Sequence, residues 1–491
     1  MKKTSIVLIL LLLGISTRLG AKNLWAFLTY ATFNSPEGPY VETYLSVAAN
    51  TLRFVKKENG KYQASVNILM TFKKDGQIKA FKKYDFFSSE IDDTTKVNFN
   101  DIDQQRFSLA NGTYDFEIKL ADNNKNTPAV PYSQQIQLDF PTDTPSLSGI
   151  QLIKSFVKAA APGALTKSGY DLVPHVFSVY PPTEPKLSFY CEIYNTDKKF
   201  GKDQKYILTY GIEAFETSMR LVDYIKIKKE TAREITVLLA DLSIDKLASG
   251  SYNLFVEIRN QQNEVVEGKK LFFHRSNPSA QMAIADIQTA NIANTFAEKI
   301  TGIDSLKEFI NSTFPIATGL EKSFIRGSVK KSDLKTLQQF FYTFWQERDA
   351  NNPEKRWLAY HQEVIKVQAN FGTPVKRGYQ TDRGRVYLLY GPPNNREGHY
   401  NEPSSYPYEI WQYYTLNNTQ RNKKFVFYSP DMVTSDFTLL HSDAIGEINE
   451  PRWQILLRSR IYAPLDLQDT QIISSWGENQ DDEWTLPTSN L

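Results

Sequence analysis

The chain has very little of the thiol and imidazole chemistry on which many catalytic and metal sites depend. Its 491 residues include one cysteine, Cys191, and five histidines. One cysteine cannot form an intrachain disulfide, and the apolar run around Cys191, residues 187–194, favours a buried and unreactive thiol. The histidines are scattered, with no HExxH, no CxxC and no aspartate-rich calcium loop. We therefore expect no metal site and no cofactor.

Other common signatures are missing from the sequence as well. There is no Gly-x-Ser-x-Gly elbow and no glycine-rich phosphate loop. The 57 basic and 55 acidic residues nearly cancel, which gives no sign of the basic surface that nucleic-acid binding requires. The apolar run at residues 6–15 is well short of the ~20 residues that span a bilayer.

Residues 1–21 have the pattern of a secretory signal peptide. Lys2 and Lys3 precede the short apolar run, and Ala21 is an acceptable residue before a cleavage site. Cleavage there would leave 54 basic and 55 acidic residues, a net charge near −1. We expect an exported protein with no transmembrane segment after cleavage.

Two stretches, residues 22–145 and 171–277, show the short strands and regular turn signals of Ig-like β-sandwiches. Residues 146–170 between them indicate a linker with one docked, strand-like run. A local signature recurs at an offset of 138 residues, where Leu109, Ala110, Gly112 and Tyr114 match Leu247, Ala248, Gly250 and Tyr252. This predicts a duplicated sandwich in which each tyrosine hydroxyl bonds nearby backbone, as in a tyrosine corner; chance similarity is the alternative.

After the second sandwich, the apolar period changes from two to about 3.6. We expect a helical connector over 278–330, an α+β domain over 331–445 and a partly disordered C-terminal extension over 446–491. In the α+β domain, one helix should begin after a cap at Ser332, and a second should begin at Asn352-Pro353 and stop at Gly372. A turn at 378–382, a strand over 383–390 and three further strands should follow. The fold class is thus two all-β sandwiches, a helical connector and a C-terminal α+β domain.

Residues 378–382, Gly-Tyr-Gln-Thr-Asp, resemble the motif of the GWxTD domain family, which is named for Gly-Trp-x-Thr-Asp. Tyr379 stands where the family has tryptophan. The ordered set of matching residues is more specific than the motif: Trp345, Arg348, Asp349, Gly378, Tyr379, Thr381, Asp382, Arg383, Gly384, Tyr390, Gly391, Pro392, Pro393, Glu409 and Trp411. The resemblance implies an exported protein of two-membrane bacteria, with β-rich domains before the signature domain and no established biochemical activity.

Two functions of different classes fit these residues. The first is a non-catalytic scaffold or protein-interaction module in the periplasm or at the outer membrane, which binds other envelope proteins or an outer-membrane complex. Its contact surface is expected in the polar segment 394–407 and beside the strand at 408–414, with five residues as contacts: Arg396, His399, Tyr400, Tyr406 and Tyr408. A disordered insertion is the alternative interpretation of that segment.

The second function is a carbohydrate-active or cell-wall-binding enzyme that uses Asp382 and Glu409 as a pair of carboxylates. The structural interpretation of the same residues is that Asp382 caps its own turn and that Glu409 pairs with Arg383 or Arg385 across a sheet. Likewise, we expect Trp345 to lie in the core and Arg348-Asp349 to form an ion-paired helix end.

Overall fold

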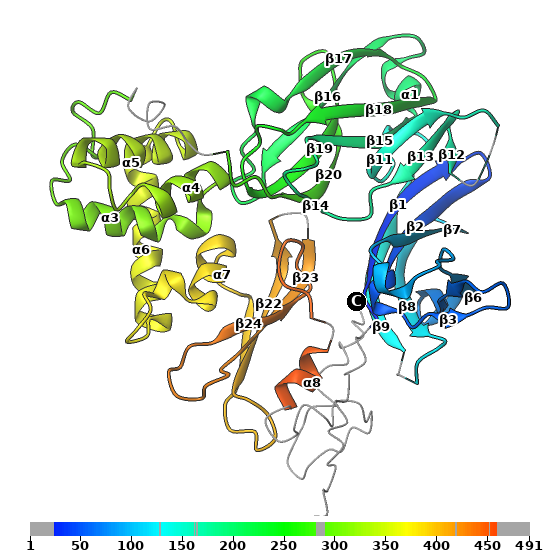
Figure 1. Cartoon of the computed structure of the whole chain (residues 1–491). Coiled ribbons are helices and arrows are strands. Elements are labelled where there is room, and N and C mark those ends of the chain that lie inside the picture. Colours follow the sequence, from blue (N-terminus) through cyan, green and yellow to red (C-terminus); the bar gives the residue numbers. More distant parts are fainter. Residues whose placement is uncertain are drawn as a thin grey trace, which may run out of the picture.

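The computed structural model describes residues 24–126, 129–161, 163, 165–280, 290–417, 420–450 and 452–458. The expected signal peptide, the first apolar residues of the connector and most of the C-terminal extension lie outside these ranges. The chain is mostly β-sheet, and most of its helices follow residue 300. Figure 1 shows the sandwiches on the right and at the top, the helices α3–α6 on the left, and a small sheet below them.

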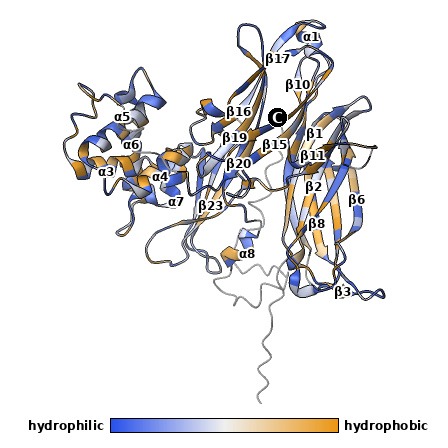
Figure 2. Ribbon diagram, turned by 45° about the horizontal axis from the view of Figure 1, so that its top comes forward, coloured by the Kyte–Doolittle hydropathy of each residue, from blue (hydrophilic) through white to orange (hydrophobic). Residues whose placement is uncertain are grey.

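The first sandwich consists of two antiparallel sheets packed around one core. One sheet has the order β1 (Ala26–Ser35), β2 (Gly38–Ala48), β7 (Asn100–Ser108). The other has the order β6 (Gln77–Phe87), β5 (Ser65–Lys74), β8 (Gly112–Asp122), β9 (Val130–Leu138), and a small hairpin joins β3 (Val55–Lys56) to β4 (Tyr62–Gln63). Buried and exposed residues alternate along β8, and Figure 2 shows the matching change in hydropathy.

The second sandwich repeats this arrangement. In one sheet β15 (Lys186–Tyr194) lies between β11 (Gln151–Lys158) and β18 (Ile235–Ser243). The other sheet has the order β17 (Lys226–Thr231), β16 (Lys205–Ala214), β19 (Gly250–Arg259), β20 (Val265–Arg275), β14 (Val179–Tyr180). A short helix, α1 (Thr196–Phe200), follows β15. Cys191 is fully buried in the core, and burial raises its pKa to about 12.

The duplication is supported by both topology and the predicted tyrosine bonds. β8 lies between β5 and β9, and β19 lies between β16 and β20, so the two signature strands occupy equivalent places. The hydroxyl of Tyr114 donates to the carbonyl oxygen of Ala110 at 2.9 Å, and that of Tyr252 donates to Ala248 at 3.0 Å. Both predicted corner bonds are therefore confirmed.

Residues 146–170, expected to be a linker, contribute strands to the second sandwich. β10 (Ser146–Leu147) and β11 pair with β15, while β12 (Thr166–Lys167) and β13 (Tyr170–Pro174) extend the same sheet. The same segment contacts the first sandwich, because the N–H of Gly149 donates to Thr32 at 2.6 Å. The Lys167 ammonium also pairs with Glu42, whose side chain is fully buried. The two sandwiches therefore share a buried polar interface.

The helical part is formed by α3 (Ile303–Ser312), α4 (Gly319–Gly327), α5 (Leu334–Arg348) and α6 (Pro353–Phe371), which share an aromatic core. The described residues 290–302 of the connector form turns rather than the expected helix. The cap of α5 is Asp333, whose carboxylate accepts the N–H of Thr336, so the expected cap at Ser332 is wrong by one residue. The Asn352-Pro353 start of α6 and its stop at Gly372 are confirmed.

The remaining elements form a small sheet with one helix on each face. Its order is β21 (Asn395–His399), β22 (Tyr408–Leu416), β23 (Gln420–Tyr428), β24 (Thr438–Ser442). The short turn η5 (Gly378–Gln380) leads into α7 (Asp382–Tyr390), which shares a core with one face, and α8 (Trp453–Arg458) packs on the other. The strand expected over 383–390 is therefore wrong, because those residues form α7.

Candidate functional site

The Thr-Asp end of the motif is a helix start. The Thr381 hydroxyl accepts the N–H of Gly384 at 3.1 Å, which is the bond of a helix N-cap. The same hydroxyl donates to the carbonyl of Gly378 at 2.8 Å. Thr381 thus fixes both the turn before α7 and the first turn of the helix.

The two glycines of this region allow a close approach of backbones. A Cβ atom on Gly384 would lie 1.9 Å from the carbonyl oxygen of Gly378, and one on Gly378 would lie 2.5 Å from the carbonyl oxygen of Val367 in α6. The N–H of Gly378 also donates to the side chain of Gln368 at 2.8 Å. The motif therefore joins α6 to α7 at a distance that only glycine permits.

We expect the substitution Gly384→Ala to destabilise the α7 region by roughly 1–3 kcal/mol or more, because the new methyl group would meet backbone atoms. The substitution Gly327→Ala at the end of α4 is the matched control, since no atom lies within 4 Å of its added Cβ. Urea unfolding followed by tryptophan fluorescence measures both variants. Equal midpoints for the two variants would contradict the close-approach explanation.

Tyr379 connects the motif to α3. Its ring is buried, and its hydroxyl donates to the carboxylate of Glu308 at 3.3 Å. Burial and this carboxylate together raise the pKa of Tyr379 well above its ordinary value, so the hydroxyl stays protonated. A tyrosine can therefore supply a polar hydrogen at the position where the family has an indole.

Asp382 does not cap its own turn as expected, since Thr381 has that role. Instead, the half-buried carboxylate accepts the N–H of Leu439 in β24 at 2.8 Å. It also lies in the first turn of α7, where a negative charge is favoured by the helix dipole. Asp382 therefore ties the start of α7 to the far edge of the sheet.

We expect Asp382→Ala to cost about 1 kcal/mol of stability or more, because it leaves the Leu439 N–H without its acceptor. Asp382→Asn should keep most of this stability, since an amide oxygen can accept the same bond. Urea midpoints of the two variants test this difference. If alanine and asparagine are equally destabilising, the bond to Leu439 does not explain the residue.

The second expected carboxylate, Glu409 in β22, is at the centre of a buried ion cluster. Its side chain is fully buried and accepts hydrogen bonds from four side chains. These are Arg383 Nη1 at 2.7 Å, Arg396 Nη2 at 2.9 Å and Nε at 3.1 Å, the Tyr400 hydroxyl at 2.9 Å and Trp411 Nε1 at 2.9 Å. The predicted pairing of Glu409 with Arg383 is confirmed, although Arg383 comes from a helix and not from the sheet.

The two guanidinium groups are held by aromatic rings. The Arg383 guanidinium carbon lies 4.2 Å from the centre of the Phe437 ring, and its Nη2 donates to the carbonyl of Ser435 at 2.9 Å. That of Arg396 lies 5.7 Å from the Trp411 ring. Burial acts to raise the pKa of Glu409, but the hydrogen bonds and charges of Arg396 and Arg383 outweigh it, so the pKa is below its ordinary value. The carboxylate is ionised and its acceptor sites are used.

The other motif residues also have structural contacts. Arg348 makes a two-pronged ion pair with Glu321 across α4 and α5, both bonds at 2.8 Å, and Trp345 is buried in the aromatic core. Asp349 accepts the N–H groups of residues 351 and 352 at 3.1 and 3.0 Å. These outcomes confirm the core position of Trp345 and the ion pair of Arg348.

The end of α7 is fixed in a similar way. Gly391 has φ of 85°, which suits a residue that ends a helix, and Pro392 and Pro393 follow it. Its carbonyl accepts the Tyr413 hydroxyl at 2.9 Å. The hydroxyl of Tyr390 donates to Glu447 at 3.0 Å, and Glu447 also pairs with Arg385. No sequence pattern pointed to Glu447, which lies 57 residues from Tyr390.

The polar segment 394–407 includes a strand, so its alternative interpretation as a disordered insertion is wrong, and only some of its residues are exposed. It forms β21, which covers the edge of β22, and Ser404 and Ser405 are buried. Tyr408, an expected contact, is only 1% exposed.

Of the other expected contacts, two are packed against the sheet and two are exposed. His399 stacks on Tyr408 at 4.5 Å between ring centres, and Tyr406 packs against Tyr428. Arg396 and Tyr400 are exposed, with Tyr400 at 48%. Only these two remain as surface candidates.

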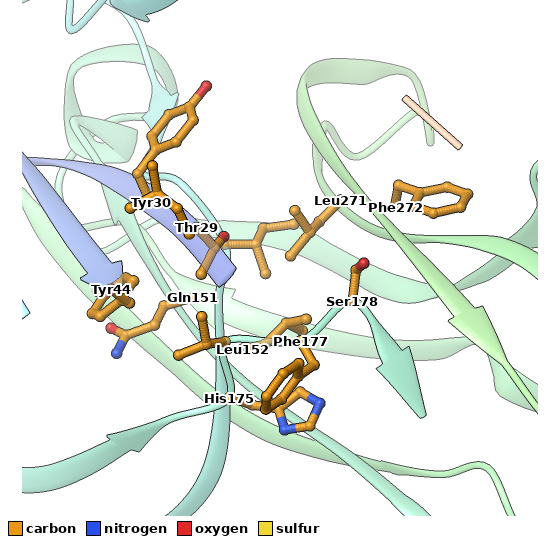
Figure 3. Close-up of a pocket in the computed structure, with 13 residues that line it drawn as sticks. Thr29, Tyr30, Tyr44, Gln151, Leu152, His175, Phe177, Ser178, Leu271 and Phe272 are labelled. Carbon is orange, nitrogen blue, oxygen red and sulfur yellow. The ribbon is translucent and has the colours of Figure 1, made fainter. Parts of the chain in front are cut away.

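The described residues offer little else for chemistry. Within those ranges no three His, Cys, Asp or Glu side chains are grouped to hold a metal ion, and no helix there combines the length and apolar character needed to cross a membrane. A hollow of about 110 Å³ lies between the sandwiches, with Tyr30 and Tyr44 on one side and Leu152, His175 and Leu271 on the other (Figure 3).

Comparison with known families assigns the C-terminal part of the chain. Residues 289–451 match the family model described as the GWxTD domain. The chain carries a GWxTD domain. The resemblance found in the motif is therefore confirmed, and the match includes the helices α3–α7, the small sheet and the Glu409 cluster.

Apart from its GWxTD domain, the chain has only slight similarity to other proteins. No curated protein matches it in sequence. A red sea bream transglutaminase has 8% identity and a TM-score of 0.17 over 53% of this chain and 32% of its own. A glycosyl hydrolase family 2 member from Bacteroides cellulosilyticus has 12% identity and a TM-score of 0.18, over 48% of this chain and 28% of its own. The fibronectin(III)-like modules of Clostridium thermocellum CbhA have 10% identity and a TM-score of 0.13, over 48% of this chain and 85% of their own. The chain thus spans about a third of the transglutaminase, and none of these similarities carries a functional argument.

Proposed function

We propose that this chain is exported and acts as a non-catalytic scaffold of the cell envelope, in which the GWxTD domain binds another envelope protein. In the proposed domain layout, two Ig-like sandwiches are followed by a helical connector and the α+β domain. The protein would work in the periplasm or at the outer membrane, alone or as part of an outer-membrane complex. The charged start and short apolar run of residues 1–21 support export.

One observation carries the non-catalytic part of this proposal: both carboxylate oxygens of Glu409 already accept hydrogen bonds from other side chains. A glycosidase needs one carboxylate that can hold a proton and a second that reaches substrate or water. Glu409 is 0% exposed, its pKa is lowered, and its oxygens accept bonds from two arginines, a tyrosine and a tryptophan. The other carboxylate, Asp382, is bonded to the backbone of β24. These contacts favour a structural role over hydrolysis.

A second observation supports a binding role, because the cluster holds exposed residues in fixed positions. We use the name rim for four of them: Arg396, Tyr400, Met432 and Val433. Arg396 and Tyr400 bond Glu409 directly, while Arg383 bonds Ser435 at the base of the loop that presents Met432 and Val433, which are 49% and 84% exposed. Arginine, tyrosine and methionine are enriched where proteins meet. The rim is therefore the part of the domain that best fits a partner.

The proposal is tested by placing a photo-crosslinking amino acid at Val433 in the full chain, expressed in its native host. The matched control carries the same amino acid at Lys198, which is exposed on α1 of the second sandwich. We expect a crosslinked adduct in the envelope fraction from position 433 and none from position 198. A chain that stays in the cytoplasm would overturn export, and equal results at the two positions would overturn the rim as the binding surface.

A further inference from the structure

We infer that the outer edge of β21 receives an extended, acidic segment of a partner protein, which adds to the sheet as a fifth strand. This inference rests on the proposed function and names the chemistry of its partner. In the described chain β21 pairs with β22 alone, and its residues 395–398 are exposed. An edge strand presents unpaired N–H and C=O groups, which an extended peptide can pair.

The edge lacks most of the devices that keep other strands away. Soluble proteins protect edges with proline, bulges or charged side chains that project outward. β21 contains no proline, and its pairing with β22 runs without a bulge from Asn395 to His399. Its one cationic side chain, Arg396, is fixed on Glu409 by two hydrogen bonds. The positive charge of the strand is thus held against the face of the sheet, while the exposed Glu397 lies on the opposite face and accepts a hydrogen bond from the Asn395 side chain.

The charges on that face favour a carboxylate on the incoming strand. Arg396 and Gly398 pair with Trp411 and Glu409, so Arg396 lies on the same face as the Glu409 cluster. The cluster sets two guanidinium groups against one carboxylate, which leaves one positive charge. The Arg396 side chain is still 41% exposed. A partner carboxylate on this face would complete the charge balance and make a cross-strand ion pair.

A second copy of this chain fits the edge less well. Two β21 strands that pair antiparallel around a symmetry axis would place Glu397 opposite Glu397 in the register in which all five residues overlap. Like charges directly opposite one another destabilise a strand pair. The sequence of β21 therefore favours a different partner with an acidic residue.

Tyr400 provides an aromatic surface next to this edge. A Cβ atom on Gly398 would lie 2.6 Å from the Tyr400 ring, so the ring lies directly against the glycine. The Tyr400 hydroxyl donates a hydrogen bond to Glu409, and the residue is still 48% exposed. An apolar side chain of the added strand, next to its carboxylate, would pack against this ring.

The test uses disulfide tethering, which makes weak peptide binding measurable. Cys191 is fully buried, and burial raises its pKa to about 12, so Asn401→Cys just after β21 supplies the reactive thiol. The probes are peptides of one Cys followed by alternating Val and Thr, with Glu, Gln or Lys at the central position. Tethered fractions are measured by intact mass at a fixed concentration of 2-mercaptoethanol.

We expect the Glu peptide to be retained about fivefold better than the Lys peptide, as a cross-strand ion pair allows. Backbone N-methylation should abolish retention, because it removes the hydrogen bonds of strand addition. Arg396→Gln should remove the preference for Glu, while Arg396→Lys and the matched control Arg421→Gln on β23 should keep it. Equal retention of Glu and Lys peptides, or retention of N-methylated peptides, would overturn the inference.

Failure here and failure of the proposed function give different results. If the peptides show no charge preference but the Val433 crosslinker captures an envelope protein, the edge inference fails and the scaffold proposal stands. If the peptides bind as expected but the chain stays in the cytoplasm, the envelope proposal fails while the edge remains a peptide site.

Discussion

Replacing Glu409 with alanine should lower the free energy of unfolding of the GWxTD domain by roughly 3–5 kcal/mol, the usual cost of removing one partner of a buried ion pair. The substitution leaves Arg383, which is 6% exposed, without its counter-charge, and it also removes the acceptor of Trp411 Nε1. Tryptophan fluorescence is a suitable measurement, because Trp345, Trp357 and Trp411 all lie within this domain.

The matched control for this substitution is Glu397→Ala on the neighbouring strand. Glu397 is exposed and bonds only the side chain of Asn395 among the described contacts, so its loss should change stability by no more than about 0.5 kcal/mol. A Glu409→Ala variant as stable as the Glu397→Ala variant would contradict the ion cluster as a stabilising centre. It would also weaken the argument against catalysis, because a carboxylate that stability does not need is free for chemistry.

Replacing Lys167 with methionine should have a comparably large effect, at the joint between the two sandwiches. Lys167 pairs with Glu42 and donates to Gln151 at 2.9 Å, and both charged side chains are at least 94% buried. Methionine leaves Glu42 with Arg106 as its cation. We expect a loss of roughly 3 kcal/mol, measured by urea unfolding with near-UV circular dichroism of the tyrosines. Lys158→Met is the control, because Lys158 is exposed on β11.

The same residue predicts a change of stability with pH. Burial lowers the pKa of Lys167 to about 8, although Glu42 acts to raise it, whereas an unfolded lysine has a pKa near 10.4. Between these values the unfolded chain binds more protons than the folded chain, so the free energy of unfolding should rise with pH. This rise should appear between about pH 8 and 9.5, below the ordinary pKa of tyrosine. It should be smaller in Lys167→Met; equal slopes would contradict the low pKa.

Local bonds could be predicted from the sequence, whereas most of the distant ones could not. The two tyrosine corners connect residues only four positions apart, so a short repeated signature was enough to find them. Arg383 reaches Ser435 and Arg385 reaches Glu447 across more than 50 residues, through a fold that no local pattern specifies. For this reason the motif was found from the sequence, together with the pairing of Arg383 and Glu409, but Ser435 and Glu447 were not.

The error at α7 arises from two periods that compete over nine residues. Val386, Leu388 and Tyr390 are spaced by two and match a strand, while Val386, Leu389 and Tyr390 match one face of a helix. The residues at the two ends of the segment distinguish a helix from a strand. Thr381 is a good N-cap, and Gly391 followed by proline is a typical helix stop. Giving those end residues more weight than the short alternation would have predicted the helix.

The contacts between the sandwiches hold the domains of the molecule at a fixed separation. Lys167 and Gly149 tie the first sandwich to the second, and the ion pair of Lys322 with Glu216 at 2.6 Å ties α4 to the second sandwich. With a flexible linker, the distance between a partner bound to the GWxTD domain and the first sandwich would vary widely. These contacts keep that distance constant. Two linked ligands that bind at opposite ends of the molecule would therefore bind with a high effective concentration at the second site only if their spacing matches this length.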